Sequence, residues 1–352
     1  MLYNVQVLRA VAALLVVHAH AASITALDLR WSGGATGVDL FFVISGFIIA
    51  YVASLDTHEF LARRLIRIVP IYWISTLVVF TLVKVIPAYF RTTSPDPVLL
   101  VRSLLFLPTG WNVHTSDGIP HPTLSGGWTL NYEMYFYVVY AISLAISKRR
   151  ATVIAIGVLL GVIALVHATS LADHPATAFY GNPIVLEFVF GMLAFHLIEA
   201  LGKPDVVPAG LVAKLILAVT IALGFVLLAF SEEVFGEAPR WLVSGIPGFA
   251  ILVSAVLLER RYGLRVTNRV AVMVGDASYV LYLIHVYVVL GVIRLVIGHR
   301  TMSEGVGQLI TVVLMIVSAA AAVAIYRYFE QPILRMLKRR LLAPTIKSTR
   351  RA

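Results

Sequence analysis

Ten apolar runs follow one another along the chain, each close to the ~20 residues that an α-helix needs to cross a bilayer. The hydrocarbon core offers no water to backbone polar groups, so a run of this kind crosses it as a helix. The composition agrees, because 60% of the residues are hydrophobic and only 13% are charged. The sequence therefore predicts an all-α, polytopic integral membrane protein with about ten transmembrane helices. The predicted spans are residues 5–27, 36–55, 67–90, 124–146, 151–169, 182–200, 209–231, 239–258, 273–297 and 306–329.

Basic residues gather in alternate loops between the predicted spans. One set of loops and the C-terminal tail hold Arg63, Arg64, Arg67, Lys148, Arg149, Arg150, Lys203, Arg260, Arg261, Arg265, Arg269 and the basic residues from Arg335 to Arg351. The other set holds Arg30, Arg91, Arg102, Arg240 and Arg300. By the positive-inside rule, the first set and both termini are cytoplasmic. The net charge of +10 then serves mostly to anchor the protein at the inner leaflet, and binding to nucleic acid is the weaker explanation of it.

The chain contains no cysteine, which excludes disulfides, thiolate nucleophiles and Cys-ligated metals from its chemistry. Neither an internal repeat nor a change of composition marks a second soluble domain. We therefore expect one integral-membrane domain over residues 1–334, followed by a basic cytoplasmic tail over residues 335–352.

The longest stretch outside the predicted spans is residues 91–123, on the outer side of the membrane. A loop of this length in a compact protein is more often a lid or a binding element than a passive connection. It contains His114, Asp117 and His121, but their spacing fits no zinc site, so solvated loop residues are the better interpretation and no metal is expected.

Arg9 and His20 both lie inside the first predicted span. At about 100° per residue, their separation returns them to nearly the same helix face, with His20 roughly 16 Å further along the axis. Ionisable groups inside a bilayer usually face a polar cavity, so this stripe is a candidate reaction site. In the alternative interpretation, His20 bonds a neighbouring carbonyl and serves only in helix packing.

Arg63, Arg64 and Arg67 stand at the cytoplasmic entrance of the third predicted span. Arg64 and Arg67 share one helix face, and two guanidinium groups so arranged match phosphate oxygens. Topology-determining charge or contact with lipid head groups is the alternative. Pro70, just inside the span, is expected to pre-shape or kink the helix.

Two further spans begin on the outer side with polar residues. Asp39 lies at the start of the second span, where it either contributes to a site or caps the helix. Ser45 follows two turns deeper and is interpreted mainly as a close-packing partner of Gly46. Glu133, two turns into the fourth span among tyrosines, faces either a ligand or an arginine such as Arg9 in a structural ion pair.

The ninth predicted span carries Ser278, Tyr282 and His285 on a single helix face. A polar stripe on a buried helix predicts a cavity. Glu330, at the cytoplasmic end of the tenth span, is expected either to order the loop arginines or to cap the bundle.

These motifs follow one another in a recognisable order. They are Leu8 to His20, Gly37 to Phe47, Arg64 and Arg67 with Pro70 and Tyr72, Trp128 to Glu133, Ser278 to His285, and Glu330 to Pro332. On a frame of ten predicted spans, this order resembles the acyltransferase type 3 family of bacterial integral-membrane O-acyltransferases. The branch of ExoZ-like exopolysaccharide acetyltransferases is the most similar in length and in the opening Asn4-x-Gln6-x-x-Arg9.

The resemblance implies a multi-pass protein of the bacterial inner membrane whose domain 1–334 is the acyltransferase domain. It implies an acyl-CoA donor, usually acetyl-CoA, used on the cytoplasmic side, and no metal. The implied acceptor is a sugar hydroxyl of an exopolysaccharide, another cell-surface glycan or a lipid-linked precursor. Membrane lipids are the other expected partners, and an oligomer or a polysaccharide-biosynthesis complex is compatible with the sequence.

The expected roles are assigned position by position. The catalytic residues are His20, Arg9 and Glu133, the donor-binding residues are Arg64, Arg67, Arg63 and Tyr72, and the cavity or acceptor residues are Asp39, Ser45, Trp128, Tyr282 and His285. The fourth-span motif departs from the family pattern, because Thr129 and Met134 replace a serine and a second acidic residue. This departure leaves Glu133 as the one carboxylate of that motif.

The resulting hypothesis is that the phosphates of coenzyme A bind Arg64 and Arg67 while the pantetheine arm extends toward His20. A neutral imidazole can take the proton from a sugar hydroxyl as it attacks the thioester. Arg9 or Glu133 would orient the groups or stabilise developing charge. The rival hypothesis is a transporter or flippase component that uses the intramembrane Arg, His and Glu residues, although no repeat of the kind common in transporters is found.

Overall fold

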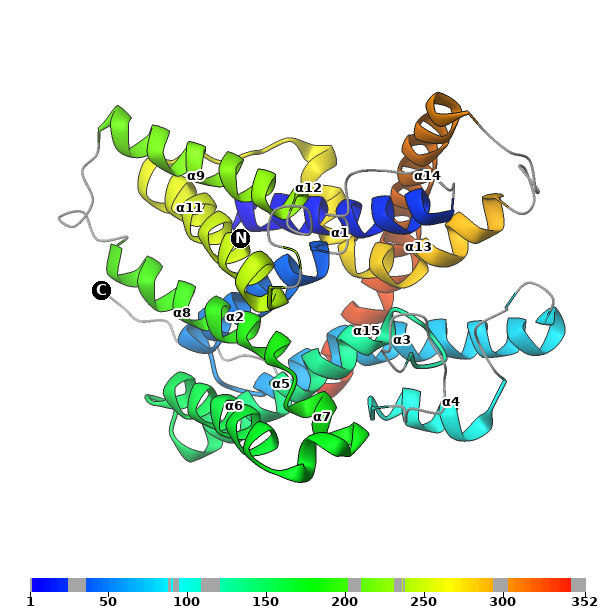
Figure 1. Cartoon of the computed structure of the whole chain (residues 1–352), viewed down its shortest axis with the longest axis horizontal. Coiled ribbons are helices and arrows are strands. Elements are labelled where there is room, and N and C mark those ends of the chain that lie inside the picture. The colour runs from blue at the N-terminus through cyan, green and yellow to red at the C-terminus, as the bar shows by residue number, and fades with distance from the viewer. Residues whose placement is uncertain are drawn as a thin grey trace.

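A computed structural model describes residues 2–24, 36–87, 90, 95–108, 121–201, 210–230, 236, 238–293 and 303–342. These residues are helical almost throughout, and no strand occurs among them (Figure 1). The prediction of an all-α protein is therefore confirmed. Residues 109–120 and 343–352, which include His114, Asp117 and most of the basic tail, lie outside the described residues.

Each predicted span corresponds to one long helix or to a pair of helices. The first half of the chain contains α1 (Tyr3–Ile24), α2 (Gly37–Leu55), α3 (Phe60–Val85), α4 (Pro97–Leu104), α5 (Gly127–Ile146), α6 (Ala151–Ala168), η2 (Ser170–Asp173) and α7 (Pro175–Tyr180). The second half contains η3 (Pro183–Val185), α8 (Leu186–Leu201), α9 (Leu211–Ala229), η4 (Trp241–Gly245), α11 (Ile246–Tyr262), α12 (Arg269–Asp276), α13 (Ser278–Val292), α14 (Glu304–Ile325), η6 (Tyr326–Glu330) and α15 (Gln331–Leu341).

Eight helical segments among the described residues are long and apolar enough to cross a membrane, and the bent pair α12 and α13 raises the number to nine. The helix α5 is not among them, although it has 20 residues, and it carries Thr129, Asn131 and Glu133 in its first half. Most of the predicted segments are thus confirmed as helices able to span a membrane. The count of ten and the cytoplasmic position of the termini stay predictions.

The ninth predicted span is not one continuous helix, which corrects the prediction for residues 273–297. The chain bends by 77° between α12 and α13, with Ala277 at the break. A bend here starts α13 at Ser278, so the polar stripe of that helix begins at a helix N-terminus. By contrast, α3 continues through Pro70, whose missing N–H costs one backbone hydrogen bond without ending the helix.

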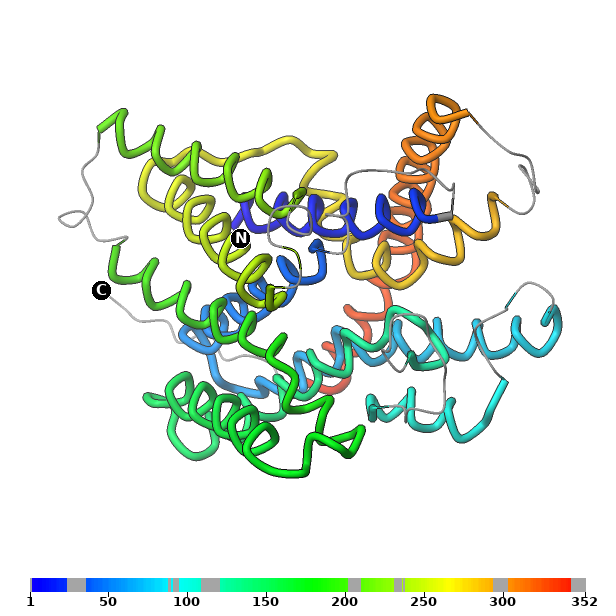
Figure 2. Tube along the Cα trace, viewed as in Figure 1, coloured from blue at the N-terminus to red at the C-terminus, as the bar shows by residue number. Residues whose placement is uncertain are grey.

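The start of α1 is fixed by residues that lie far away in the sequence. The Glu259 carboxylate accepts hydrogen bonds from the backbone N–H groups of Tyr3 and Asn4 at 2.9 and 2.7 Å, which satisfies donors at a helix N-terminus. The Asn4 side chain donates to the carbonyls of Ala255 and Leu264 at 2.8 and 2.9 Å. This anchor places α1 among α2, α12, α13 and α14 in the middle of the bundle (Figure 2).

Glycines allow α2 and α8 to pack backbone against backbone. A Cβ atom at Gly46 would lie 2.1 Å from the carbonyl oxygen of Phe188, and one at Gly191 would lie 2.0 Å from that of Val43. Small residues at helix contacts are typical of membrane bundles, where close van der Waals packing drives association. The Gly46 half of the predicted Ser45 and Gly46 packing pair is therefore confirmed.

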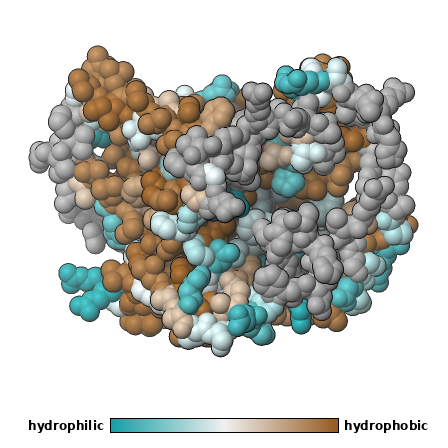
Figure 3. All heavy atoms as spheres, viewed as in Figure 1, coloured by the Kyte–Doolittle hydropathy of each residue, from teal (hydrophilic) through white to brown (hydrophobic). Residues whose placement is uncertain are grey.

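The outer surface of the bundle is strongly apolar. Figure 3 shows hydrophobic side chains over much of the face around α8 and α9. Along α9, Leu215, Val219 and Leu223 are each more than half exposed, at 54, 62 and 55%. Exposed apolar stripes of this extent mark a surface covered by something other than water, here the lipid of a membrane.

Candidate active site

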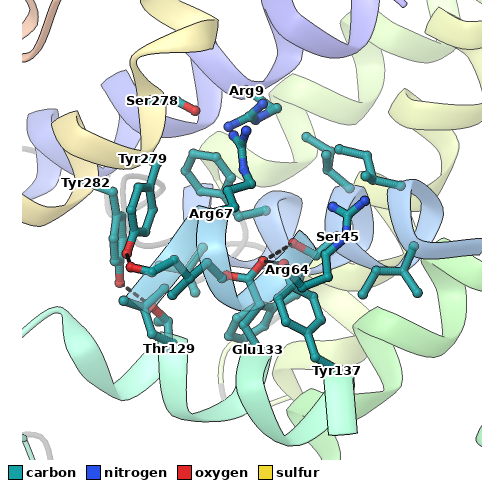
Figure 4. Close-up of a pocket in the computed structure, with 18 of the residues that line it drawn as sticks. Arg9, Ser45, Arg64, Arg67, Thr129, Glu133, Tyr137, Ser278, Tyr279 and Tyr282 are labelled. Atoms are coloured by element: carbon teal, nitrogen blue, oxygen red, sulfur yellow. Dashed lines mark hydrogen bonds between the residues drawn. The ribbon is translucent and has the colours of Figure 1, made fainter. Parts of the chain in front are cut away.

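A cavity of about 290 Å³ lies where α1, α2, α3, α5 and α13 meet, and we call it the central cavity. Its polar lining combines arginines from α1 and α3 with a carboxylate and a tyrosine from α5 and a serine from α2 (Figure 4). These residues are Arg9, Arg64, Arg67, Glu133, Tyr137 and Ser45. Residues predicted from separate motifs are therefore brought together around one space.

Three guanidinium groups face the central cavity. Arg9 donates from Nη1 to the Gln6 side chain at 3.1 Å, and Arg64 has a buried Nε without a hydrogen-bond partner. Among the described residues, no carboxylate lies within ion-pair distance of Arg9, Arg64 or Arg67. Glu133 is the one carboxylate among the described residues of the lining, so the three arginines outnumber the acidic groups there and the cavity favours an anionic ligand.

Glu133 is held by hydroxyl groups. Its carboxylate accepts hydrogen bonds from Ser45 Oγ at 3.2 Å and from the Tyr137 hydroxyl. The predicted alternative of a structural ion pair between Arg9 and Glu133 is not formed. Ser45 therefore faces the carboxylate on one side of α2, while Gly46 packs on α8.

The polar stripe of α13 divides between two environments. Ser278 and Tyr282 line the central cavity, as the sequence predicts, and the Tyr282 hydroxyl accepts a hydrogen bond from Thr129 Oγ1 at 2.8 Å. Tyr279 also lines it and donates to the Ile68 carbonyl at 2.7 Å. His285, one turn further along α13, does not contribute to the lining.

His285 instead contacts His20 of α1. The two rings meet edge to face with their centroids 4.8 Å apart, and His285 Nε2 lies 3.3 Å from His20 Nδ1. His285 is buried, whereas His20 is exposed and lies outside the lining of the central cavity. The prediction that Arg9 and His20 face one cavity is therefore wrong for His20, whose Nδ1 makes the carbonyl contact of the alternative interpretation. The Tyr282 ring lies 5.9 Å from that of His285, so Tyr282 and His285 form the wall between the cavity and His20.

Backbone carbonyls determine which ring nitrogens carry protons. His285 Nδ1 lies 2.7 Å from the Tyr282 carbonyl, and His20 Nδ1 lies 2.9 Å from the Val16 carbonyl. Because a carbonyl oxygen only accepts, both Nδ1 atoms are donors in the neutral rings. The one His20 Nδ1–H is then shared between the Val16 carbonyl and His285 Nε2, and His20 Nε2 keeps its lone pair.

Asp39 pairs with a residue that the sequence did not associate with it. Arg240 forms a two-pronged ion pair with the Asp39 carboxylate, with Nε to Oδ1 at 2.6 Å and Nη2 to Oδ2 at 2.9 Å. Asp39 is fully buried and makes no helix-capping bond, so the capping interpretation is wrong. The sequence offered one signal, the position of Arg240 at the start of a predicted span. That position does not show that Arg240 pairs with Asp39.

Two other predicted residues, Tyr72 and Arg63, lie outside the central cavity. Tyr72 is buried against Phe106, with ring centroids 4.7 Å apart. Arg63 forms an ion pair with Asp56 at 2.8 Å. The His58 backbone N–H, together with the nearby Arg63, lowers the pKa of the Asp56 carboxyl below its usual range. The donor-binding roles expected for Tyr72 and Arg63 stay predictions.

Trp128 and Glu330 also take positions of their own. Trp128 lines a different pocket, at the start of α5. Glu330 ends the segment η6 and is buried, and neither carboxylate oxygen has a hydrogen-bond partner. Glu330 was predicted to order the loop arginines, but it forms no hydrogen bond with them in the described residues. Among the described residues, no group of three or more His, Cys, Asp or Glu side chains is placed to hold a metal ion.

The fold is that of a polytopic helical membrane protein, and its central cavity is lined by three arginines and one glutamate. Comparison with known families gives the particular assignment. The family model Acyl_transf_3, which is described as an acyltransferase domain, matches residues 2–327 of the chain. The chain belongs to this family, so the predicted family is confirmed and the protein is a membrane acyltransferase.

Relatives with assigned names support the same assignment. The exopolysaccharide production protein ExoZ of Rhizobium meliloti is 31% identical over 308 residues, which cover 86% of this chain and 90% of the relative. The O-acetyltransferase OatA of Staphylococcus aureus is 24% identical over 342 residues, or 87% of this chain and 54% of the relative. This chain thus spans about half the length of OatA. No solved structure shows a significant match to the chain.

Proposed function

We propose that the protein transfers an acyl group, in most turnovers an acetyl group, from acyl-CoA to a sugar hydroxyl of an exopolysaccharide or its lipid-linked precursor. The family supports acyl transfer. The names of the relatives support an O-acetyl product and a polysaccharide acceptor, since one is an exopolysaccharide production protein and another an O-acetyltransferase. The bacterial inner membrane is the proposed location, because the activated donor is made in the cytoplasm.

The observation that carries the donor assignment is the cluster of Arg9, Arg64 and Arg67 around the central cavity. Coenzyme A carries several phosphate charges, and guanidinium groups bind phosphate oxygens through charge-assisted, often paired hydrogen bonds. Arg64 offers a buried Nε that has no hydrogen-bond partner among the residues that the structure describes. A donor phosphate at this position would supply the missing counter-charge and the missing acceptor.

The proposed transfer step uses His20 as general base. The acceptor hydroxyl oxygen attacks the thioester carbonyl carbon, and its proton passes to His20 Nε2 as the new ester bond forms. The carbon–sulfur bond then breaks, and the coenzyme A thiolate receives the proton as it leaves. Because Tyr282 and His285 lie between the central cavity and His20, the proposal requires the pantetheine arm to pass this pair and bring the thioester to His20.

Release of coenzyme A from the purified protein tests the proposal. With acetyl-CoA and de-esterified surface polysaccharide present together, we expect thiol release and an equal amount of ester on the glycan. A transporter or a non-catalytic partner of an export complex would release no thiol. Absence of thiol release from folded, monodisperse protein in the presence of both substrates would contradict the assignment.

A further inference from the structure

A second pocket, of about 320 Å³, lies at the starts of α5 and α8 and at η4, and we call it the outer pocket. The residues of its lining that matter here are Trp128, Tyr132, Asn182, Arg240 and Trp241. Each of the three predicted spans that begin here starts on the outer side of the membrane, according to the distribution of basic residues. The outer pocket therefore opens toward the side where a surface glycan is found.

Its aromatic rings are held firmly by neighbouring rings. Trp128 meets Phe42 and Tyr132 edge to face, with centroid distances of 6.5 and 6.1 Å. Trp241 packs against Phe190 at 6.3 Å. Both tryptophans are only half-buried, so each keeps part of its ring surface for a ligand.

The one cation among the described residues of the outer pocket lies against buried acidic groups. Arg240 forms a two-pronged ion pair with Asp39, and the buried Glu187 carboxyl also lies near both, while 37% of the Arg240 side chain stays accessible. Asn182 accepts from the Ile184 backbone N–H through Oδ1 at 2.9 Å, which orients the side chain and leaves its NH₂ group as a donor. A ligand for these groups needs acceptors and hydroxyls, but no charge.

Sugar rings match this combination. A pyranose presents one face of polarised C–H groups, which the negative face of an aromatic ring attracts, and an edge of hydroxyls that bond amide and guanidinium groups. We propose that the outer pocket binds an uncharged pyranose unit of the acceptor glycan, stacked on Trp128 or Trp241. This inference rests on the proposed function and adds the position of the acceptor site.

Phe42 connects the two sites. Its side chain lines the central cavity and also contacts Trp128 and Tyr132, which line the outer pocket. Phe42 thus lies between the residues of the central cavity and those of the outer pocket. The arrangement lets the donor approach from the arginine side and the acceptor from the tryptophan side of one bundle.

Equilibrium binding of a defined probe tests the outer pocket without catalysis. The probe is a set of oligosaccharides from the host bacterium's surface polysaccharide, freed of esters by mild alkali. We expect Trp128→Leu and Trp241→Leu to weaken binding roughly tenfold or more, as removal of a buried aromatic anchor does. Trp73→Leu is the matched control, because this exposed tryptophan lies on α3 away from the outer pocket. Trp128→Phe and Trp241→Phe keep a ring and should retain most of the binding.

Site protection gives a second test that keeps both tryptophans. The chain has no native cysteine, so Pro239→Cys places a single thiol at the outer pocket, and Asp173→Cys places one at an exposed position in η2. The probe should slow labelling of the first thiol by an impermeant maleimide and leave the second unchanged. Unchanged labelling of the Pro239→Cys thiol, or wild-type affinity in both Leu variants, overturns the inference.

Kinetics separate this inference from the proposed function. The Leu variants should raise the acceptor KM and leave the donor KM unchanged. If the wild-type protein binds the probe in the outer pocket but releases no coenzyme A, the proposed function fails and the pocket assignment stands. If coenzyme A release and probe binding are both unaffected by the Leu substitutions, the pocket assignment fails and the proposed function stands.

Discussion

His285 lies with Nε2 3.3 Å from Nδ1 of His20, and two backbone carbonyls determine the proton positions of the pair. His285 Nδ1–H is committed to the Tyr282 carbonyl, so its Nε2 accepts from His20. The exposed ring of His20 is thereby held in the tautomer whose Nε2 is unprotonated. A general base needs this state, and the same two-ring arrangement would stabilise the imidazolium that forms on proton transfer.

Replacement of His20 by Ala should lower the rate of acyl transfer about 10²–10⁴-fold, the usual contribution of a general base. His167→Ala is a matched control, because His167 is an exposed helical histidine whose Nδ1 bonds the carbonyl four residues earlier, as His20 does. Rates are measured as thiol release at saturating donor. Full activity of a folded His20→Ala variant would rule out the proposed base.

Replacement of His285 by Phe should have a smaller effect, about tenfold on kcat, because it removes one hydrogen bond that orients His20. His285→Gln offers a side-chain carbonyl to His20 Nδ1–H and should recover part of the rate. In the His20→Ala background, His285→Phe should cause little further loss, since a positioning residue acts through its partner. Equal losses in both backgrounds would show that His285 acts independently.

Substitution of Arg64 and Arg67 by Ala should raise the donor KM and leave the acceptor KM unchanged. The reason is the loss of two cations that face the central cavity without a carboxylate partner in the described structure. Arg149→Ala is the control, because Arg149 is an exposed arginine of a predicted cytoplasmic loop. Unchanged donor affinity in the double variant would favour a topological or lipid-binding role for these arginines.

The sequence predicted the cationic side of the site well. Arg64 and Arg67 follow a loop into a span, and Arg9 lies within a span, so local sequence indicates each of them. Their meeting in one cavity depends on the packing of α1 against its neighbours, which periodicity does not specify. The family resemblance supplied that relationship.

Two features were not predicted from the sequence: the ion pair of Asp39 with Arg240, and the break at Ala277. Asp39 and Arg240 are separated by 201 positions, and each alone is compatible with a helix cap or an outer loop. Gly275 and Asp276 directly precede the break at Ala277, but the surrounding residues are apolar enough that the sequence predicts a continuous span. Hydrophobic periodicity gives the face of a helix, but not the side chain opposite that face.

The packing of α2 against α8 allows a stability prediction. Gly191→Ala should destabilise the fold by about 1–3 kcal/mol or more, because the added Cβ would lie 2.0 Å from the Val43 carbonyl oxygen. Gly157→Ala, in α6, meets no atom within 4 Å and should be neutral or stabilising by up to about 1 kcal/mol. Thermal unfolding in one detergent compares them. Equal unfolding temperatures would contradict the predicted backbone contact.

The side of the membrane from which acetyl-CoA is used shows whether the central cavity takes its donor from the cytoplasm. Acetyl-CoA does not cross membranes, so it is added to sealed vesicles of known orientation that contain the protein and its native glycan acceptor. A thiol label on Arg149→Cys, in the otherwise cysteine-free chain, reports which membrane face holds the predicted cytoplasmic loops, among them the loop of Arg64 and Arg67. We predict coenzyme A release only when that face is exposed to the added acetyl-CoA. Release only from the opposite face, or none after the vesicles are permeabilised, would contradict a cytoplasmic donor cavity built on Arg9, Arg64 and Arg67.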